Sequence, residues 1–293
     1  MTNIILLIVC FAVGIILHRT GRFPAATPAA LNGFIIHVSL PALALLHIHR
    51  LRPDPSLIYT GAMAWLLFGA GFVFFRYAGR MAGLPDNTVG ALMLVGGLGN
   101  TSFVGLPMIE AYYGKEYLGV GLIADQLGSF LVLSTLGIFV ATIYSSGDIS
   151  PRRMVRKILL FPPFEAIILA FLLMPVPFPS WLIIVLQKLG DTLTPLALAS
   201  VGFQLRLSHI KGELKPLGIG LLYKLAIGPA LITLLFVGIM GAGGKVMQVT
   251  IFEAAMAPMI TAGIIAVDPY PAGLVVFAAR GVDERPRFRE GGI

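Results

Sequence analysis

Charged residues are scarce in this sequence, and this scarcity indicates which solvent surrounds the protein. Asp, Glu, Lys and Arg make up 12% of the 293 residues, whereas 57% of the residues are hydrophobic. A soluble globular domain carries roughly a quarter charged residues, because charged side chains cover its surface. This chain cannot cover its surface in that way, so we expect it to be surrounded by lipid.

Cysteine is nearly absent as well. The one cysteine, Cys10, lies inside an apolar run, which excludes a disulfide framework and a thiolate metal site. The 34 glycines and 20 prolines follow neither a collagen-like nor a low-complexity period and are scattered through apolar segments. We therefore expect them to interrupt helices, and we expect neither a cofactor nor a metal.

Basic residues outnumber acidic residues by 21 to 14, which gives a formal charge of +7. In a soluble protein such an excess would suggest nucleic acid, but no basic run here is interleaved with aromatic residues. Cytoplasmic loops of membrane proteins also carry extra Lys and Arg, which fix the orientation of the chain. The excess of basic residues therefore indicates that the protein lies in a lipid bilayer and does not bind nucleic acid.

Nine apolar segments are predicted to cross the membrane. A bilayer core of about 30 Å requires about 20 apolar residues per helix. The segments are 3–18, 32–49, 57–79, 87–113, 117–145, 158–178, 181–206, 214–240 and 246–267, and a tenth, 269–279, is too short.

The loops between these segments differ in positive charge. One set of alternate loops holds eleven basic residues: Arg19, Arg22, Arg76, Arg80, Arg152, Arg153, Arg156, Lys157, Arg206, Lys211 and Lys215. The other set holds four: Arg50, Arg52, Lys115 and Lys245. Because the richer set belongs in the cytoplasm, we predict a multi-pass protein of the cell membrane (plasma or inner) with its N-terminus outside.

Two pairs of prolines suggest an internal repeat. Pro41 and Pro195 have similar apolar surroundings, as do Pro107 and Pro258, and the offsets are 154 (195 − 41) and 151 (258 − 107). A unit of five spans is odd, so the second unit would enter the membrane from the opposite face, as in several transporter folds. The alternative is a chance match between prolines, which are common in membrane helices.

This repeat divides the chain into four parts. We predict a first five-helix repeat at 1–147, a basic cytoplasmic loop at 148–157, and a second repeat, spans six to nine, at 158–267. Residues 268–293 form an atypical tail in place of a tenth span. Seven of the last fourteen residues are charged, against 28 in the preceding 279, and such a segment cannot span lipid. Either a reading-frame shift altered this terminus and left the last helix incomplete, or the chain is a nine-span variant with a basic tail.

The backbone of the fourth and ninth segments is expected to break near their prolines. Proline removes a backbone donor, and in lipid such a break is tolerated where it faces protein or a wet cavity. A half-helix that begins at the break would direct partial positive charge at an anion. The predicted anion site consists of Asn100, Thr101, Ser102, Gly105, Pro107, Ala257, Pro258, Met259 and Thr261. The alternative is that the small polar residues only join neighbouring helices.

Ionisable residues inside the predicted spans are few, and each is costly enough to need a reason. Glu253, five residues before Pro258, would bind a coupling ion, H⁺ or Na⁺, or accept a hydrogen bond from a neighbouring helix. Lys188 and Asp191 are three residues apart and are expected to pair on one face. No partner is visible in the sequence for Asp125, Gln126, Glu165 and Lys224, and an interfacial position accounts for Glu110.

Residues 100–114, with the sequence NTSFVGLPMIEAYYG, resemble the fourth-span signature of the auxin efflux carrier family, whose bacterial members are described as malate or malonate permeases. The resemblance covers roughly residues 1–267, and Pro41, Asp191 with Pro195, and the Met-Ala-Pro turn at 256–258 fit the same pattern. Plant members carry a long central loop, whereas only residues 148–157 join the two units here.

The resemblance implies a fold and a mechanism. It implies ten helices in two inverted five-helix repeats, similar to bile-acid symporters and Na⁺/H⁺ antiporters, and carboxylate substrates moved by an elevator-like motion. It implies that Asn100 contacts the substrate and that the fourth and ninth helices cross at Pro107 and Pro258. Lys188 and Asp191, with Pro41 and Pro195, would form an adjacent supporting site.

Together these features favour a secondary carrier that exports small organic anions, such as dicarboxylates or auxin-like carboxylates. One alternative is a Na⁺-coupled organic-anion symporter of the same fold, and another is a membrane-embedded enzyme. An enzyme would need paired carboxylates or a His-rich cluster at one membrane depth. Only His47 and His49 are close together, and they lie at a span end beside Arg50, so we do not expect an enzyme. The sequence is compatible with a homodimer.

Overall fold

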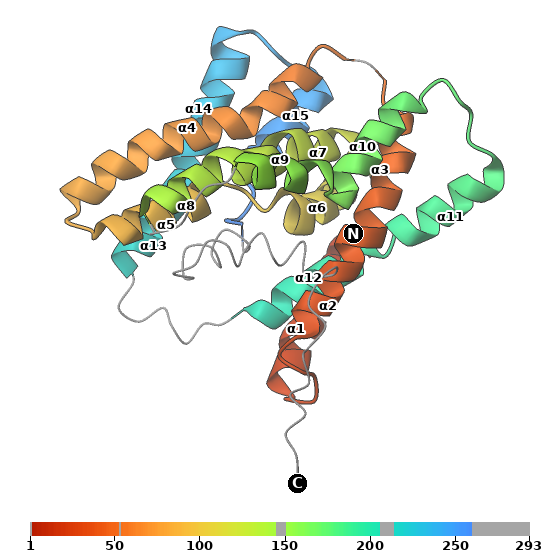
Figure 1. The fold of residues 1–293 in the computed structure, drawn as a ribbon, viewed down its shortest axis with the longest axis horizontal. Coiled ribbons are helices and arrows are strands. Elements are labelled where there is room, and N and C mark those ends of the chain that lie inside the picture. The colour runs from red at the N-terminus through yellow and green to blue at the C-terminus, as the bar shows by residue number, and fades with distance from the viewer. Residues whose placement is uncertain (1, 53, 145–150, 206–213, 260–293) are drawn as a thin grey trace.

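The computed structural model describes residues 2–52, 54–144, 151–205 and 214–259, and this part of the chain is almost entirely helical (Figure 1). Its only extended pairing is one isolated antiparallel bridge between Gly99 and Pro258. Among the described residues, five helices are long and apolar enough to cross a membrane: Thr27–His49, Leu57–Met81, Lys115–Tyr144, Ser180–Gln204 and Leu214–Ile239. The prediction of an all-α polytopic membrane protein is confirmed.

Helices occupy each of the first five predicted spans. The elements are α1 (Thr2–Arg19), α2 (Thr27–Phe34), η1 (Ile35–Ser39), α3 (Leu40–His49), α4 (Leu57–Met81), α5 (Asp86–Gly97), η2 (Thr101–Gly105), α6 (Leu106–Tyr112), η3 (Lys115–Tyr117), α7 (Leu118–Ile123), η4 (Ala124–Phe130), η5 (Leu133–Gly137) and α8 (Ile138–Tyr144). The second span runs without a gap from α2 through η1 into α3, whereas the fourth span is interrupted between α5 and η2.

The second half of the chain continues the pattern. Its elements are α9 (Pro151–Leu159), α10 (Pro162–Leu172), α11 (Ser180–Gly190), α12 (Leu193–Gln204), α13 (Leu214–Leu222), η6 (Tyr223–Ile227), α14 (Gly228–Thr233), η7 (Leu234–Ile239) and α15 (Gly244–Ala254). The predicted ninth span at 246–267 is therefore helical only to Ala254, and its residues after Met259 lie outside the described part.

The predicted limits of the sixth span, 158–178, were wrong, because the helix there, α10, is shorter. Within the predicted basic loop, residues 151–157 belong to helix α9. Prolines explain both ends of α10. Pro162 and Pro163 lie in its first turn, where proline is tolerated, while Pro175, Pro177 and Pro179 follow its end and cannot continue a helix.

The helices pack in two groups that lie on opposite sides in Figure 1. In one group α1 packs along α12, and α3 packs against α10 and α11. In the other group α4 packs against α5, η4, α14 and α15. Smaller contacts, such as those of α3 with α7 and of α12 with η2, join the two groups.

Two glycines allow α1 and α12 to approach closely. A Cβ atom on Gly14 would overlap the carbonyl oxygen of Ala199, and one on Gly202 would overlap that of Phe11. Small residues at a membrane helix interface allow two backbones to come together, which strengthens van der Waals packing where the hydrophobic effect is missing. These glycines hold the first span against the seventh.

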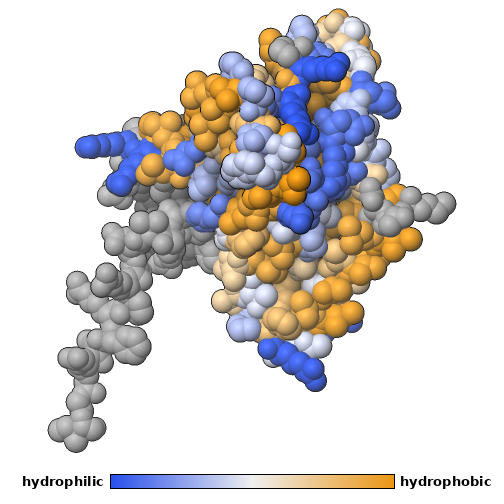
Figure 2. Space-filling view, turned by 90° about the vertical axis from the view of Figure 1, so that its right-hand side faces the viewer, coloured by the Kyte–Doolittle hydropathy of each residue, from blue (hydrophilic) through white to orange (hydrophobic). Residues whose placement is uncertain are grey.

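The outer surface is rich in large hydrophobic residues. Ile8 on α1, Leu172 on α10 and Ile239 on η7 expose 63%, 70% and 71% of their side-chain surface. Figure 2 shows broad hydrophobic areas on one face, with hydrophilic residues gathered between them. Exposed apolar area of this extent would be unfavourable in water, so it marks the surface that contacts lipid.

The turns that carry Pro41 and Pro195 contact each other. Pro41 lies in the first turn of α3, and α12 begins at Leu193, two residues before Pro195. Just before these helices, the hydroxyl oxygens of Ser39 and Thr192 lie 2.7 Å apart and share a hydrogen bond. The two prolines therefore lie close to the place where the second and seventh spans meet.

Candidate functional site

The fourth span is broken over three residues. After α5 ends at Gly97, Leu98 is extended, with φ −116° and ψ 140°, and the helix resumes at Thr101. Asn100 caps the new helical segment, because its side-chain oxygen Oδ1 accepts a hydrogen bond from the backbone N–H of Phe103 at 3.1 Å. Asparagine is a favoured N-cap residue for this reason. Pro107 is buried near the start of α6, which continues η2 without a gap.

The ninth span breaks at the same place in space. After α15 ends at Ala254, the chain runs antiparallel to residues 98–100, and Pro258 forms the bridge with Gly99. The N–H of Asn100 donates to the carbonyl of Ala257 at 2.8 Å, and the N–H of Met259 donates to that of Leu98 at 3.3 Å. Each break thus satisfies backbone groups of the other, which an interruption inside a membrane requires.

Asp125 on η4 lies beside this junction, and each of its carboxylate oxygens accepts a hydrogen bond. One oxygen accepts from the hydroxyl of Thr101 at 2.6 Å, and the other accepts from the side-chain amide of Gln126 at 2.6 Å. Thr101 of the Asn-Thr-Ser run therefore pairs with a buried carboxylate on the fifth span, a partner that the sequence did not reveal.

Lys224 on η6 reaches the same junction from the eighth span. Its side chain is completely buried, and its Nζ donates a hydrogen bond of 2.9 Å to the carbonyl of Ala254, the last residue of α15. A Cβ atom on Gly99 would lie 3.0 Å from this Nζ, so the absence of a side chain at Gly99 makes room for the ammonium group. A cation at a helix C-terminus is favourable, because the carbonyls there carry partial negative charge.

Glu253 places a second carboxylate at the junction. The residue is completely buried. Its oxygens lie against Gly105 on the fourth span, and a Cβ atom on Gly121 of α7 would lie 3.5 Å from Oε1. In the part of the chain that the structure describes, neither oxygen has a hydrogen-bond partner. The carboxylate interacts electrostatically with Asp125 and Lys224.

A second polar cluster lies outside this junction and is partly exposed. Lys115 forms ion pairs with Asp191 at 2.5 Å and with Glu110 at 3.5 Å. Glu110 also accepts from the hydroxyl of Thr194 at 2.7 Å. The predicted pairing of Lys188 with Asp191 was wrong: α11 ends at Gly190, and the Asp191 carboxylate, just beyond its end, bonds to Lys115 and Gln187 instead.

Nine of the predicted site residues fall in two places. The junction of the fourth and ninth spans brings together Asn100, Thr101, Ser102, Gly105, Ala257, Pro258, Met259 and Glu253. Asp191 joins the cluster around Lys115, and Thr261 lies outside the described residues. Sequence reasoning left Asp125 and Lys224 without a partner. The sequence offered one indication of such a partner: a lone charge in an apolar span is costly, so Asp125 and Lys224 each had to be stabilised by another group.

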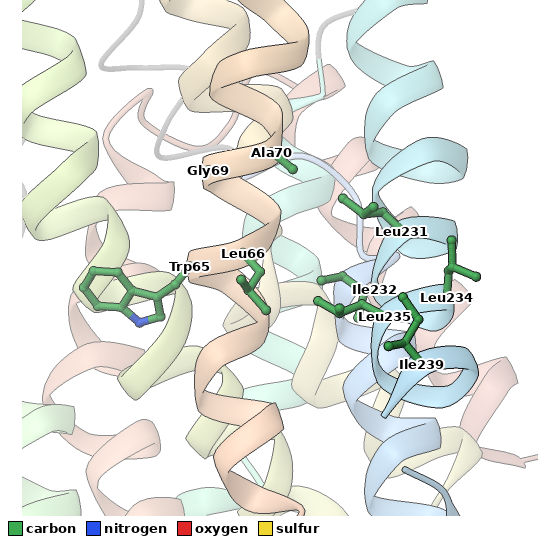
Figure 3. A pocket seen from close by; sticks show the side chains of 9 residues that line it. All are labelled: Trp65, Leu66, Gly69, Ala70, Leu231, Ile232, Leu234, Leu235 and Ile239. Atoms are coloured by element: carbon green, nitrogen blue, oxygen red, sulfur yellow. The ribbon is translucent and has the colours of Figure 1, made fainter. Parts of the chain in front are cut away.

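A separate pocket lies between α4 and α14–η7 and encloses about 380 Å³ (Figure 3). Its lining residues are Trp65, Leu66, Gly69, Ala70, Leu231, Ile232, Leu234, Leu235 and Ile239. The indole N–H of Trp65 already donates to the carbonyl of Leu127 at 3.0 Å. Specific ligand sites combine apolar walls with a few polar groups that orient the ligand. This pocket offers none to a carboxylate, so we do not assign the substrate to it.

Comparison with known proteins supplies the family. A family model described as "Membrane transport protein" matches residues 1–268. An uncharacterised transporter of Methanocaldococcus jannaschii is 25% identical over 190 residues, which cover 62% of this chain and 61% of the relative. An uncharacterised transporter of Methanothermobacter thermautotrophicus is 23% identical over 273 residues, which cover 91% of this chain and 87% of the relative. The chain thus spans less than two thirds of the first relative.

Proposed function

We propose that this chain, which belongs to the membrane transport protein family, is a secondary active carrier that exports small organic anions. Family membership and the two relatives support a membrane transporter, and the resemblance to auxin efflux carriers is confirmed by the match over residues 1–268. The substrate class, the direction and the mechanism are the proposal. Dicarboxylates and auxin-like carboxylates are the substrates that we favour.

One observation carries the choice of an anion: the broken fourth and ninth spans meet each other through Gly99 and Pro258. The helical segment from Thr101 to Tyr112 begins at this meeting point. The first N–H groups of a helix have no partner within it, and their partial positive charge favours a carboxylate. Asn100 satisfies one of them with a neutral oxygen, which leaves the site ready for the negative charge of a substrate.

The two helix groups suggest how access alternates. We assign α4, α5, α6, η4, η6 and α15, which build the junction, to a moving unit, and α1, α2, α3, α10, α11 and α12 to a fixed unit. The close backbone packing at Gly14 and Gly202 favours a rigid first-to-seventh span contact in the fixed unit. An elevator-type displacement of the moving unit would carry the junction, with its substrate, from one side of the membrane to the other.

Flux into proteoliposomes tests this function. The full-length chain is reconstituted, and uptake of labelled malonate, malate and indole-3-acetate is measured at several concentrations. We expect saturable flux of at least one of these carboxylates and its loss in Asn100→Ala. The matched control is Asn87→Ala, which removes an exposed asparagine from the first turn of α5 and should retain the flux.

The same experiment can overturn the proposal. If none of the three anions shows saturable flux, and Asn100→Ala cannot be distinguished from the parent, the chain does not export small carboxylates through this junction. Hydrolysis or modification of a probe by the reconstituted protein, in place of flux, would favour the membrane-embedded enzyme.

A further inference from the structure

Three ionisable side chains meet at the junction of the broken spans, and all three are withdrawn from solvent. Asp125 is 3% exposed, and Lys224 and Glu253 are completely buried. They come from the fifth, eighth and ninth spans, so the junction gathers them from segments far apart in the sequence. Among the described residues, the ionisable groups that interact electrostatically with Glu253 are Asp125 and Lys224.

The three side chains differ in the hydrogen-bond partners that stabilise their charged forms. Asp125 accepts hydrogen bonds from Thr101 and Gln126, which stabilise a negative charge. Lys224 donates to the carbonyl of Ala254, and the C-terminus of α15 stabilises its positive charge. Within the described ranges both oxygens of Glu253 are buried without a donor, and Lys224 lies beyond ion-pairing distance of them. A buried carboxylate in that situation is strongly disfavoured as an anion.

The surroundings of Glu253 suit a proton better than a metal cation. A Cβ atom on Gly105 would lie 2.5 Å from its Oε1, so the carboxyl group is packed tightly against that backbone. On the side of Gly121, the neighbouring side chains are those of Leu106 and Ile109, which are apolar. Hard cations in proteins are bound by several oxygen ligands at once, and among the residues that the structure describes no such set surrounds Glu253. A proton requires only one oxygen.

We propose that Glu253 is the site of a proton that moves with the substrate and that Lys224 is a resident cation which replaces Na⁺ at this junction. The inference rests on the proposed transport function and deepens it by naming the coupling ion. With Asp125 ionised and Lys224 protonated, their charges cancel, and the junction is neutral only when Glu253 holds a proton.

The coupled step follows from this charge balance. A proton from water forms an O–H bond with the Glu253 carboxylate on one side of the membrane, and the same bond breaks on the other side. Without the proton the junction carries one net negative charge, which repels an organic anion approaching Asn100. With the proton this repulsion disappears, so one proton and one anion bind together and cross together. Export by this step requires the outward gradient of the anion to exceed the inward gradient of the proton.

Infrared spectroscopy of the purified full-length protein tests whether Glu253 is protonated, and it needs no substrate. We expect the wild type to show the carbonyl stretching band of a buried neutral carboxylic acid and Glu253→Gln to lack it. A second variant, Asp125→Asn, leaves Glu253 in place and tests the charge balance. Removing the Asp125 charge lets Glu253⁻ balance Lys224⁺, so the acid band should disappear. Gln126 can accommodate the new amide by turning its unpartnered Oε1 toward it.

Two further variants complete the set. Lys224→Gln removes the resident cation, so Asp125 should also take a proton and the acid band should grow. Asp191→Asn, in the partly exposed cluster around Lys115, is the matched control and should leave the band unchanged. The thermal stability of the wild type should be equal in sodium chloride and in choline chloride at the same concentration.

Each contrary outcome overturns the inference. A wild type without the band, or a band that persists in Glu253→Gln, would remove the proton from Glu253. A band that survives in Asp125→Asn would refute the charge balance between the three groups and with it the coupled step. A rise in stability with sodium that Glu253→Gln abolishes would make the junction a Na⁺ site. If Glu253→Gln fails to fold, the wild-type band and the sodium comparison still test the proton, and the spectra of Asp125→Asn and Lys224→Gln test the charge balance. Because none of these readouts needs a transported anion, they remain informative even if the proposed carboxylate flux is absent.

Discussion

The carboxylate of Glu253 occupies the space that a side chain on Gly105 would need. A Cβ atom built on Gly105 would overlap Oε2 and lie 2.5 Å from Oε1 and 2.7 Å from the carboxyl carbon. The two residues come from the ninth and fourth spans, on either side of the junction. A glycine is therefore required at 105 so that the acidic side chain of the other broken span can lie at the junction.

Gly105→Ala should displace the Glu253 carboxylate. Overpacking of a well-packed interior typically costs about 1–3 kcal/mol, so we expect a lower unfolding temperature and a loss of anion flux. Thermal unfolding of the purified variant measures the unfolding temperature, and uptake into proteoliposomes measures the anion flux. Gly33→Ala in α2 is the control, because a Cβ atom there has open space. Equal behaviour of the two variants would contradict the tight packing at Gly105.

Asn100→Asp should separate folding from transport. Aspartate caps helices about as well as asparagine, so the bond to the N–H of Phe103 can be kept and the protein should fold. The new carboxylate, however, places a fixed negative charge where we propose that the substrate anion binds. Malonate flux should be lost, while the unfolding temperature stays close to that of the parent. Retained flux would show that the anion binds elsewhere.

Gly202→Ala should weaken the contact between the first and seventh spans. The added Cβ overlaps the carbonyl of Phe11, which belongs to backbone and cannot move aside as a flexible side chain would. A loss of about 1–3 kcal/mol is expected for such overpacking. Thermal unfolding measures it, with Gly218→Ala in α13 as the control, since nothing lies within 4 Å of that position. A variant as stable as its control would refute the close approach of α1 and α12.

The ion pair between Lys115 and Asp191 should contribute little to stability. Both side chains are 46% exposed, and exposed ion pairs are worth roughly 0–1 kcal/mol because solvent and salt screen them. A double-mutant cycle with Lys115→Met and Asp191→Asn, analysed by thermal unfolding, gives the coupling. A coupling clearly larger than this range would mean that the pair is shielded from solvent by lipid or by another chain.

Labelling of single cysteines should reveal the orientation of the chain. In a Cys10→Ser background, Arg52→Cys should react with a membrane-impermeant maleimide added to intact cells, and Arg22→Cys should not. Both positions are exposed and lie in successive loops, so they serve as controls for each other. The reverse pattern would place the N-terminus inside and contradict the charge rule.

Prolines and apolar runs reveal the helical layout of this protein from sequence alone. They indicated every described span, and the Gly-Pro-rich stretch between Gly96 and Pro107 indicated the break in the fourth span. The limits of α10 were misjudged because the apolar run continues past Leu172 through prolines that end the helix. Hydropathy measures the solvent preference of a segment, and it does not register where a helix ends.

The site was only partly predictable, because its contacts join spans that are distant in sequence. Glu253 was recognised from the cost of a charge in lipid, but the same reasoning left Asp125 and Lys224 without partners. A sequence spacing of three suggested that Lys188 pairs with Asp191, yet the end of α11 at Gly190 turns that carboxylate toward Lys115. Asp191 still bonds to Gln187, four residues earlier, so local spacing identified neighbours of the carboxylate but not the cation that pairs with it.

The mutual hydrogen bonding of the two breaks also constrains how the protein is made. The N–H of Asn100 and the carbonyl of Leu98 find their partners at Ala257 and Met259, which the ribosome adds more than 150 residues later. Until then the fourth span holds unsatisfied backbone groups, each of which costs several kcal/mol in hydrocarbon. After the N-terminal half is inserted, water or another protein must therefore shield these backbone groups of the fourth span. The fourth span reaches its final fold only after the ninth span has been synthesised and inserted.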